Sequence, residues 1–138
     1  MPASRVGKNN ALNYNFGSTA YPDTLPATMW FGLAITSAVT ETTTGATVTE
    51  PAGNGYARVD YTNNKTTWAV STLGTLANAI DIVFPECTPV SWGTALSIFI
   101  ADAETDGNIW WYYTLSPTFP VIAGTITTFE AGSIVASM

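Results

Sequence analysis

Two stretches of the sequence alternate apolar and polar residues with a period of two. In residues 78–84, the side chains of Ile80, Ile82 and Phe84 fall on one face. Residues 95–101 repeat the pattern. Such alternation is typical of β-strands with one buried face, and no stretch of the chain shows sustained helical spacing with caps. The sequence therefore predicts a protein built from strands.

Seven further runs are rich in valine, isoleucine, threonine and aromatic residues, which suit a pleated, half-buried surface. They are residues 29–36, 47–50, 56–61, 66–70, 109–114, 124–129 and 133–136. Glycine, asparagine and proline fall between the runs and supply turns. Eight or nine short strands at near-regular spacing predict an all-β, jelly-roll-like β-sandwich. The one helix we expect is short and lies at residues 9–16.

The first 27 residues differ from the rest because glycine, asparagine and proline are mixed with scattered aromatic side chains at Tyr14, Phe16 and Tyr21. We expect an extended N-terminal arm here that gains order by lying on a neighbouring subunit. An ordinary flexible terminus is the alternative. The β-sandwich domain is expected over residues 28–138.

The charge content limits the partners of the chain. Charged residues make up 10% of the sequence, against about 25% in typical globular domains. A subunit that hides surface against its neighbours needs less charge than a free protein. The net charge of −6 and four scattered basic residues argue against a nucleic-acid partner, because binding phosphates needs clustered lysine and arginine. No apolar run has the length of a membrane helix and no secretory leader is present, so we expect no membrane partner.

The chemistry-bearing residues are too few for catalysis. The chain has no histidine and a single cysteine, Cys87, so neither a catalytic triad nor a histidine metal site can form. Residues 102–107 match the start of a calcium-binding loop, but position 12 is Tyr113, where a bidentate glutamate is needed. A hairpin turn is the better interpretation of this segment. We expect no enzyme activity, no cofactor and no metal site.

The run Trp110-Trp111-Tyr112-Tyr113 is the sharpest local feature. In a strand, alternate members of this run share a face, so one aromatic face enters the core and the other is exposed or covered. Three interpretations stay open: a subunit interface, where such residues are enriched, a strand buried on both faces, and a platform for stacking sugars. The candidate interface residues are three aromatic side chains of the arm and two of this strand: Tyr14, Phe16, Tyr21, Trp111 and Tyr113.

A series of short motifs follows in one order along the chain. These are Trp30-Phe31-Gly32-Leu33, Thr49-Glu50, Gly55-Tyr56-Ala57-Arg58-Val59, Thr67-Trp68, Ile82-Val83-Phe84-Pro85, Ser91-Trp92-Gly93-Thr94, Ile98-Phe99-Ile100-Ala101-Asp102-Ala103, Gly107-Asn108-Ile109, Tyr112-Tyr113, Ala123-Gly124-Thr125 and Phe129-Glu130-Ala131-Gly132. The series, which covers roughly residues 29–136, resembles small tailed-phage virion proteins often labelled tail fibre proteins, a group that includes capsid cement or decoration subunits. The resemblance implies an all-β, jelly-roll-like virion subunit without catalysis.

Composition and resemblance together predict a capsid cement protein, made in the host cytoplasm. It would bind the major capsid protein on the capsid exterior and associate with itself as a homo-oligomer, a dimer or trimer. Many modest interfaces would stabilise the shell by multivalency. The alternative is a receptor- or glycan-binding module on a tail fibre or spike. Aromatic rings on a concave surface would favour the alternative, and rings against another subunit would favour cement.

Overall fold

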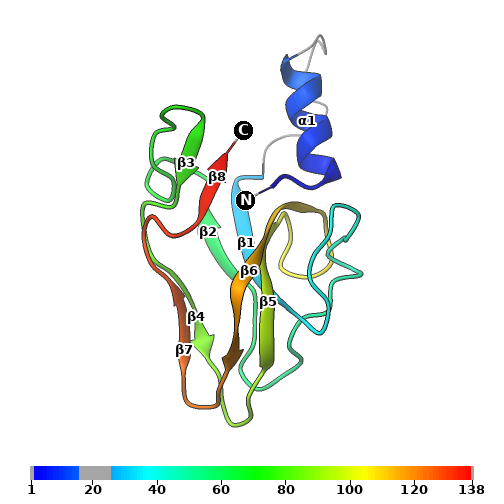
Figure 1. Cartoon of the computed structure of the whole chain (residues 1–138), viewed down its shortest axis with the longest axis vertical. Helices are drawn as coiled ribbons and strands as arrows, with labels where there is room; N and C mark the ends of the chain where they lie inside the picture. Colours follow the sequence, from blue (N-terminus) through cyan, green and yellow to red (C-terminus); the bar gives the residue numbers. More distant parts are fainter. Residues whose placement is uncertain (1, 16–25, 138) are drawn as a thin grey trace.

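The fold consists of eight strands and one helix in a computed structural model that describes residues 2–15 and 26–137 (Figure 1). The elements are α1 (Arg5–Asn15), β1 (Thr28–Ile35), β2 (Val59–Thr62), β3 (Thr75–Ala77), β4 (Ile82–Glu86), β5 (Gly93–Ala101), β6 (Ile109–Val121), β7 (Ile126–Phe129) and β8 (Val135–Ser137). All strand pairs are antiparallel, which confirms the predicted all-β fold. Among these elements, no helix is long and apolar enough to cross a membrane.

Two layers enclose the main core. One layer is a four-stranded sheet in the order β2-β1-β5-β6, and the other holds the pairs β3-β8 and β4-β7 (Figure 1). The buried side chains between them come from both layers: Met29, Phe31, Leu33, Trp68, Ile82, Phe84, Cys87, Trp92, Ala95, Ile98, Ile100, Leu115, Val121 and Ile134. Burial of this apolar surface is the main stabilising contribution to the sandwich.

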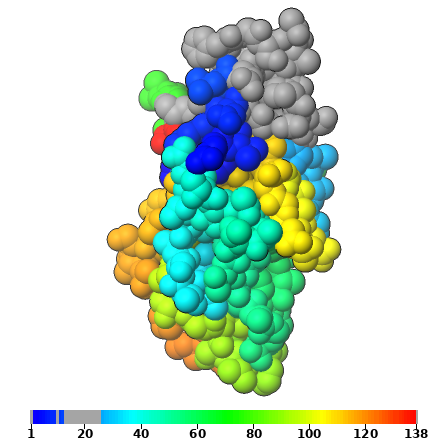
Figure 2. Space-filling view, turned by 90° about the vertical axis from the view of Figure 1, so that its right-hand side faces the viewer, coloured from blue at the N-terminus to red at the C-terminus, as the bar shows by residue number. Residues whose placement is uncertain are grey.

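A second, smaller core lies on the outer face of the four-stranded sheet. The connection between β1 and β2 folds over that face, as the cyan to green atoms of Figure 2 show. Val39 and Val48 of this connection pack with Phe99 of β5. The Val39 N–H donates to Ser97 Oγ at 3.1 Å. Strands β1 and β5 are therefore buried on both faces, whereas their sequences predicted only one buried face.

The N-terminal segment is less extended than the predicted arm, because the helix expected at residues 9–16 begins earlier and spans Arg5–Asn15 as α1. Ser4 caps this helix, since its Oγ accepts from the Gly7 N–H at 3.3 Å. The Ser4 N–H also donates to the carbonyl oxygen of Trp110 at 2.9 Å, next to an isolated bridge between Ala3 and Trp111. A Cβ on Gly7 would lie 2.6 Å from that carbonyl oxygen, so glycine permits the close approach. Residues 2–7 thus contact β6 of their own chain.

Two of the predicted strands are not formed. Residues 47–50 belong to a loop in which the Thr44 N–H donates to Thr47 Oγ1 at 2.9 Å. Threonine side chains there take up backbone N–H groups that would otherwise bond to a neighbouring strand. Residues 66–70 make a single bridge, Trp68 to Asn78. In contrast, β6 continues past Pro117 and Pro120, which sequence analysis assigned to turns. Proline is tolerated there because β6 is an edge strand, with no partner strand across its outer side at these residues.

Candidate functional site

A pocket of about 390 Å³ opens at the end of the sandwich that carries α1, between the two layers. Its walls come from the beginnings of β1 and β6, the segment after β2, and the pair β3-β8. The lining residues are Pro26, Ala27, Met29, Asn63, Asn64, Lys65, Trp68, Leu76, Ile100, Trp110, Trp111 and Ala136. Three of the five tryptophans of the chain therefore meet at one site.

The deep part of the pocket is apolar. Trp68 is buried against Met29, and its indole N–H points to the thioether sulfur of Met29 at 3.3 Å. Trp111, which also lines the pocket, is partly buried against the main core. Among the described lining residues, Lys65 at the mouth carries the one charge. The pocket is thus suited to a ligand with an apolar face and polar groups at one edge.

Trp110 reaches the pocket because the ladder between β5 and β6 is irregular. Ile100 pairs with Trp111 and Ala101 pairs with Ile109, which leaves Trp110 as an extra residue. Such a bulge redirects a side chain. The Trp110 indole N–H donates to Asp102 Oδ2 at 3.1 Å, which fixes the orientation of this lining residue.

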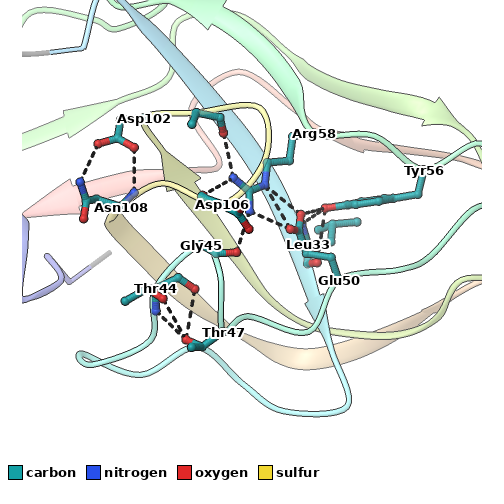
Figure 3. Close-up of polar contacts among 11 residues, drawn as sticks. Leu33, Thr44, Gly45, Thr47, Glu50, Tyr56, Arg58, Asp102, Asp106 and Asn108 are labelled. Atoms are coloured by element: carbon teal, nitrogen blue, oxygen red, sulfur yellow. Dashed lines mark hydrogen bonds and ion pairs between the residues drawn. The ribbon is translucent and has the colours of Figure 1, made fainter.

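Asp102 begins the loop that connects β5 to β6. Its Oδ1 accepts from the Asn108 N–H at 2.8 Å, and its Oδ2 accepts from the Asn108 amide at 3.1 Å (Figure 3). The carboxylate therefore closes the loop on itself in addition to holding Trp110. Residues 102–107 form the predicted turn, and the Asp102 carboxylate is occupied by three hydrogen-bond donors.

Arg58 anchors the same loop from the other side (Figure 3). Its Nη1 donates to the carbonyl oxygens of Ala103 at 2.8 Å and Asp106 at 2.9 Å. Its Nη2 donates to the Gly45 carbonyl oxygen at 3.3 Å and to Glu50 Oε2 at 2.8 Å. The side chain is 1% exposed, so this is a buried ion pair with its donors used.

Tyr56 completes this buried cluster. Its hydroxyl donates to Glu50 Oε1 at 2.6 Å and accepts from the Leu33 N–H at 2.9 Å. Burial, together with the Glu50 carboxylate, raises the pKa of Tyr56 above its usual range. The cluster explains the motif Gly55-Tyr56-Ala57-Arg58-Val59 as a structural element, because its polar residues hold the loops that cover the four-stranded sheet.

The structure separates the five predicted interface residues. Trp111 lines the pocket, and Tyr113 is 45% exposed on the edge strand β6. Tyr14 belongs to α1, with its side chain outside the part described, and Phe16 and Tyr21 lie outside the described residues altogether. The aromatic run of β6 is therefore divided: Tyr112 packs with the outer core, while Trp111 packs with the main core and reaches the pocket.

Sequence reasoning missed Trp68 and Trp110 as pocket residues. Trp68 is far from β6 in the sequence, and no local pattern joins the two. The sequence did contain one signal for Trp110. Asp102 stands just before the predicted turn and Trp110 just after it, so the Asp102 carboxylate could accept a hydrogen bond from the indole N–H. The bulge that brings Trp110 to the pocket has no signature in the alternation of β6.

Comparison with known proteins assigns the chain to a family. It matches the family described as "Podophage GP4 fiber I protein gp80", and the match covers residues 2–137. None of the curated proteins matches the chain.

Proposed function

Because the chain belongs to the family of podophage GP4 fiber I proteins, we propose that it is a fibre subunit whose aromatic pocket binds a carbohydrate of the host cell surface. The family makes the chain a structural protein of the phage virion, of the fibre type. The pocket is the single observation that carries the ligand proposal. Binding without catalysis is the activity that we propose for it.

A carbohydrate suits the pocket because a pyranose ring has an apolar face and a polar rim. Trp111 is partly exposed, and Trp68 and Trp110, which are 6% and 7% exposed, line the pocket beside it, so the wall is aromatic and apolar. The volume of about 390 Å³ falls in the range of small-molecule sites, about 300–1,000 Å³.

The mouth of the pocket offers polar groups for the hydroxyls. Asn63 and Asn64 lie there beside Lys65. The Asn64 Oδ1 is used locally, since it accepts from the Thr66 N–H at 2.9 Å. The Asn64 amide NH₂ makes no hydrogen bond with the described residues that is evident in the structure, so it is available to a ligand.

The test is binding of the purified protein to cells that the phage infects, with a variant that obstructs the pocket. Ala27 is exposed at the mouth, so Ala27→Phe narrows the pocket without touching the core. Ala46→Phe, at an exposed position of the β1–β2 connection, is the matched control. We expect the wild type and Ala46→Phe to bind cells and free surface glycan to compete. Equal binding by Ala27→Phe would contradict the pocket proposal.

A capsid cement function is the second candidate, favoured by the low charge content of 10%. Its partners would be the major capsid protein and further copies of the chain. The expected reach of the arm supports it less, since residues 2–4 bond to β6 of the same chain. Adding labelled protein to particles that lack it decides between the two: attachment to the tail supports the fibre proposal, and attachment to the head with slower DNA release on heating supports cement.

A further inference from the structure

The mouth of the pocket carries a positive charge. Lys65 lines it and is exposed, and none of the lining residues within 2–15 and 26–137 is acidic. This local charge runs against the rest of the chain, which has ten acidic and four basic residues. An anionic group that a ligand brings to the mouth would therefore meet a cation at short range.

The ammonium group of Lys65 is available to a ligand. Arg58 is buried in an ion pair with Glu50, and Lys8 pairs with a glutamate at 3.2 Å. Lys65, in contrast, forms no ion pair with the part of the chain that the structure describes. Its three N–H donors can therefore make charge-assisted hydrogen bonds to a bound anion.

The turn that holds Lys65 is fixed against the pocket wall. Asn64 Oδ1 accepts from the backbone N–H groups of Thr66 at 2.9 Å and Thr67 at 3.1 Å. The backbone N–H of Trp68 donates to the Asn64 carbonyl oxygen at 3.0 Å. These contacts on both sides of Lys65 hold its backbone, so its ammonium group stays tethered to the mouth.

The polar groups of the mouth are mostly donors. The Asn64 amide NH₂ lies beside Lys65 and adds two N–H donors, while the Asn63 amide NH₂ is used by the carbonyl oxygen of Pro26 at 3.0 Å. Asn63 Oδ1 is the remaining side-chain oxygen acceptor among the described lining residues, since Asn64 Oδ1 is engaged. A hydroxyl needs an acceptor for its own proton, whereas a carboxylate only accepts. The mouth is therefore better matched to a carboxylate than to a set of hydroxyls.

We propose that the pocket selects an acidic saccharide, whose carboxylate binds Lys65 and Asn64 while its ring lies against the tryptophans. The inference rests on the proposed carbohydrate function and adds the class of the ligand. One cation matches the single negative charge of a uronic acid. A phosphate monoester carries about −1.5 to −2 at pH 7 and would leave charge uncompensated.

The net charge of −6 does not prevent this contact. Charges farther away than about 8 Å are largely screened at physiological salt. The carboxylate of Asp102, behind Trp110, already accepts from three donors. The short-range attraction of Lys65 therefore determines the preference.

The test is titration of the full chain with two uronic acids, glucuronate and galacturonate, followed by tryptophan fluorescence. Glucose and galactose are the matched neutral sugars, since they carry CH₂OH in place of the carboxylate. We expect each uronate to bind at least about tenfold more tightly than its neutral counterpart. Lys65→Met should reduce this ratio to within about twofold, and Lys65→Arg should retain most of it.

Lys8→Met is the control, because it changes the net charge by the same amount and Lys8 does not line the pocket. It should keep the wild-type preference, and thermal unfolding verifies that all variants fold. Equal binding of uronates and neutral sugars overturns the inference but leaves the carbohydrate proposal intact. A preference that Lys65→Met retains in full, or tighter binding of glucose 6-phosphate than of glucuronate, overturns it as well.

Host surface polysaccharide repeats the comparison on the natural glycan, before and after chemical reduction of its carboxyl groups. We expect reduction to weaken binding at least about tenfold. Where no monosaccharide binds, this comparison decides, and unchanged binding after reduction overturns the inference. Host-cell binding by Ala27→Phe reports separately on the carbohydrate proposal itself.

Discussion

Trp110 and Asp102 are joined by a hydrogen bond from the indole N–H to a carboxylate oxygen at 3.1 Å. This contact links the buried Arg58 cluster to the pocket. Asp102 lies in the loop that Arg58 anchors, and Trp110 lies in the wall of the pocket. The buried cluster on the outer face of the sheet therefore sets the position of a ring in the proposed binding site.

Replacing Asp102 tests this link. In Asp102→Asn, an amide donor would face the three donors that converge on the carboxylate, so we expect a loss of about 1–3 kcal/mol in the free energy of unfolding. The affinity for the pocket ligand should fall as well. Asp106→Asn is the control, since only the backbone carbonyl oxygen of Asp106 bonds to Arg58. Urea unfolding of both variants is the measurement, and equal stability of the two would contradict the role of Asp102.

The two ion pairs found among residues 2–15 and 26–137 should differ in strength. Arg58→Met leaves Glu50 without its cation and two loops without their anchor, so it should lower the free energy of unfolding by about 3–5 kcal/mol. Lys8→Met breaks the ion pair between Lys8 and Glu41. Because these two side chains are 47% and 48% exposed, the variant should lower the free energy of unfolding by less than about 1 kcal/mol. Denaturant midpoints of the two variants give the comparison. A loss of under about 1 kcal/mol for Arg58→Met would show that the cluster does not stabilise the fold.

Tyr56 makes stability depend on alkaline pH. Its pKa is raised in the folded protein above the ordinary value of 10.0, so the unfolded chain loses this proton first as pH rises. The contribution of the protonated Tyr56 hydroxyl to the free energy of unfolding is complete below pH 10. Above pH 10 it declines by about 1.4 kcal/mol per pH unit, until the pH reaches the pKa of Tyr56 in the folded protein. Tyr56→Phe removes this decline. The measured quantity is the difference in free energy of unfolding between wild type and Tyr56→Phe from pH 8 to 11, and a difference that stays constant throughout would refute the assignment.

Gly32 is predicted to tolerate no side chain. A Cβ at this position would lie 2.3 Å from Cζ of Phe99, far inside van der Waals contact with the ring that the Arg58 guanidinium covers at 5.1 Å. Gly32→Ala should therefore cost about 1–3 kcal/mol through overpacking. Adding Phe99→Leu makes room, so the double variant should lose less than the sum of the two single losses. If thermal unfolding shows that the stability losses of Gly32→Ala and Phe99→Leu add up in the double variant, the added methyl group and the Phe99 ring are not in contact.

Much of the fold follows from the sequence because strand alternation and turn residues are local properties. The strands β1, β5 and the first half of β6 coincide with predicted runs. The second core was not predicted, since nothing in the pattern of β5 tells that the β1–β2 connection covers Phe99. The helix was predicted at residues 9–16 and spans 5–15. Its first turn holds Gly7, a poor helix former whose close approach to Trp110 is a tertiary property that the sequence does not reveal.

The candidate site was predictable only in part. Trp111 stood out because four aromatic residues follow one another, and the structure does bring it to a concave surface. Trp68 joins it through the packing of a segment that makes one bridge with Asn78. Such long-range contacts depend on how the layers pack, which periodicity does not encode.

Tryptophan fluorescence during titration with carbohydrates tests the central claim most directly. Three of the five tryptophans line the pocket, so a ligand that enters it must alter their emission. We predict a saturable change with a saccharide of the host cell surface, reproduced by Ala46→Phe and absent in Ala27→Phe. An emission spectrum that stays unchanged with every host saccharide, or a change that persists in Ala27→Phe, would contradict the account.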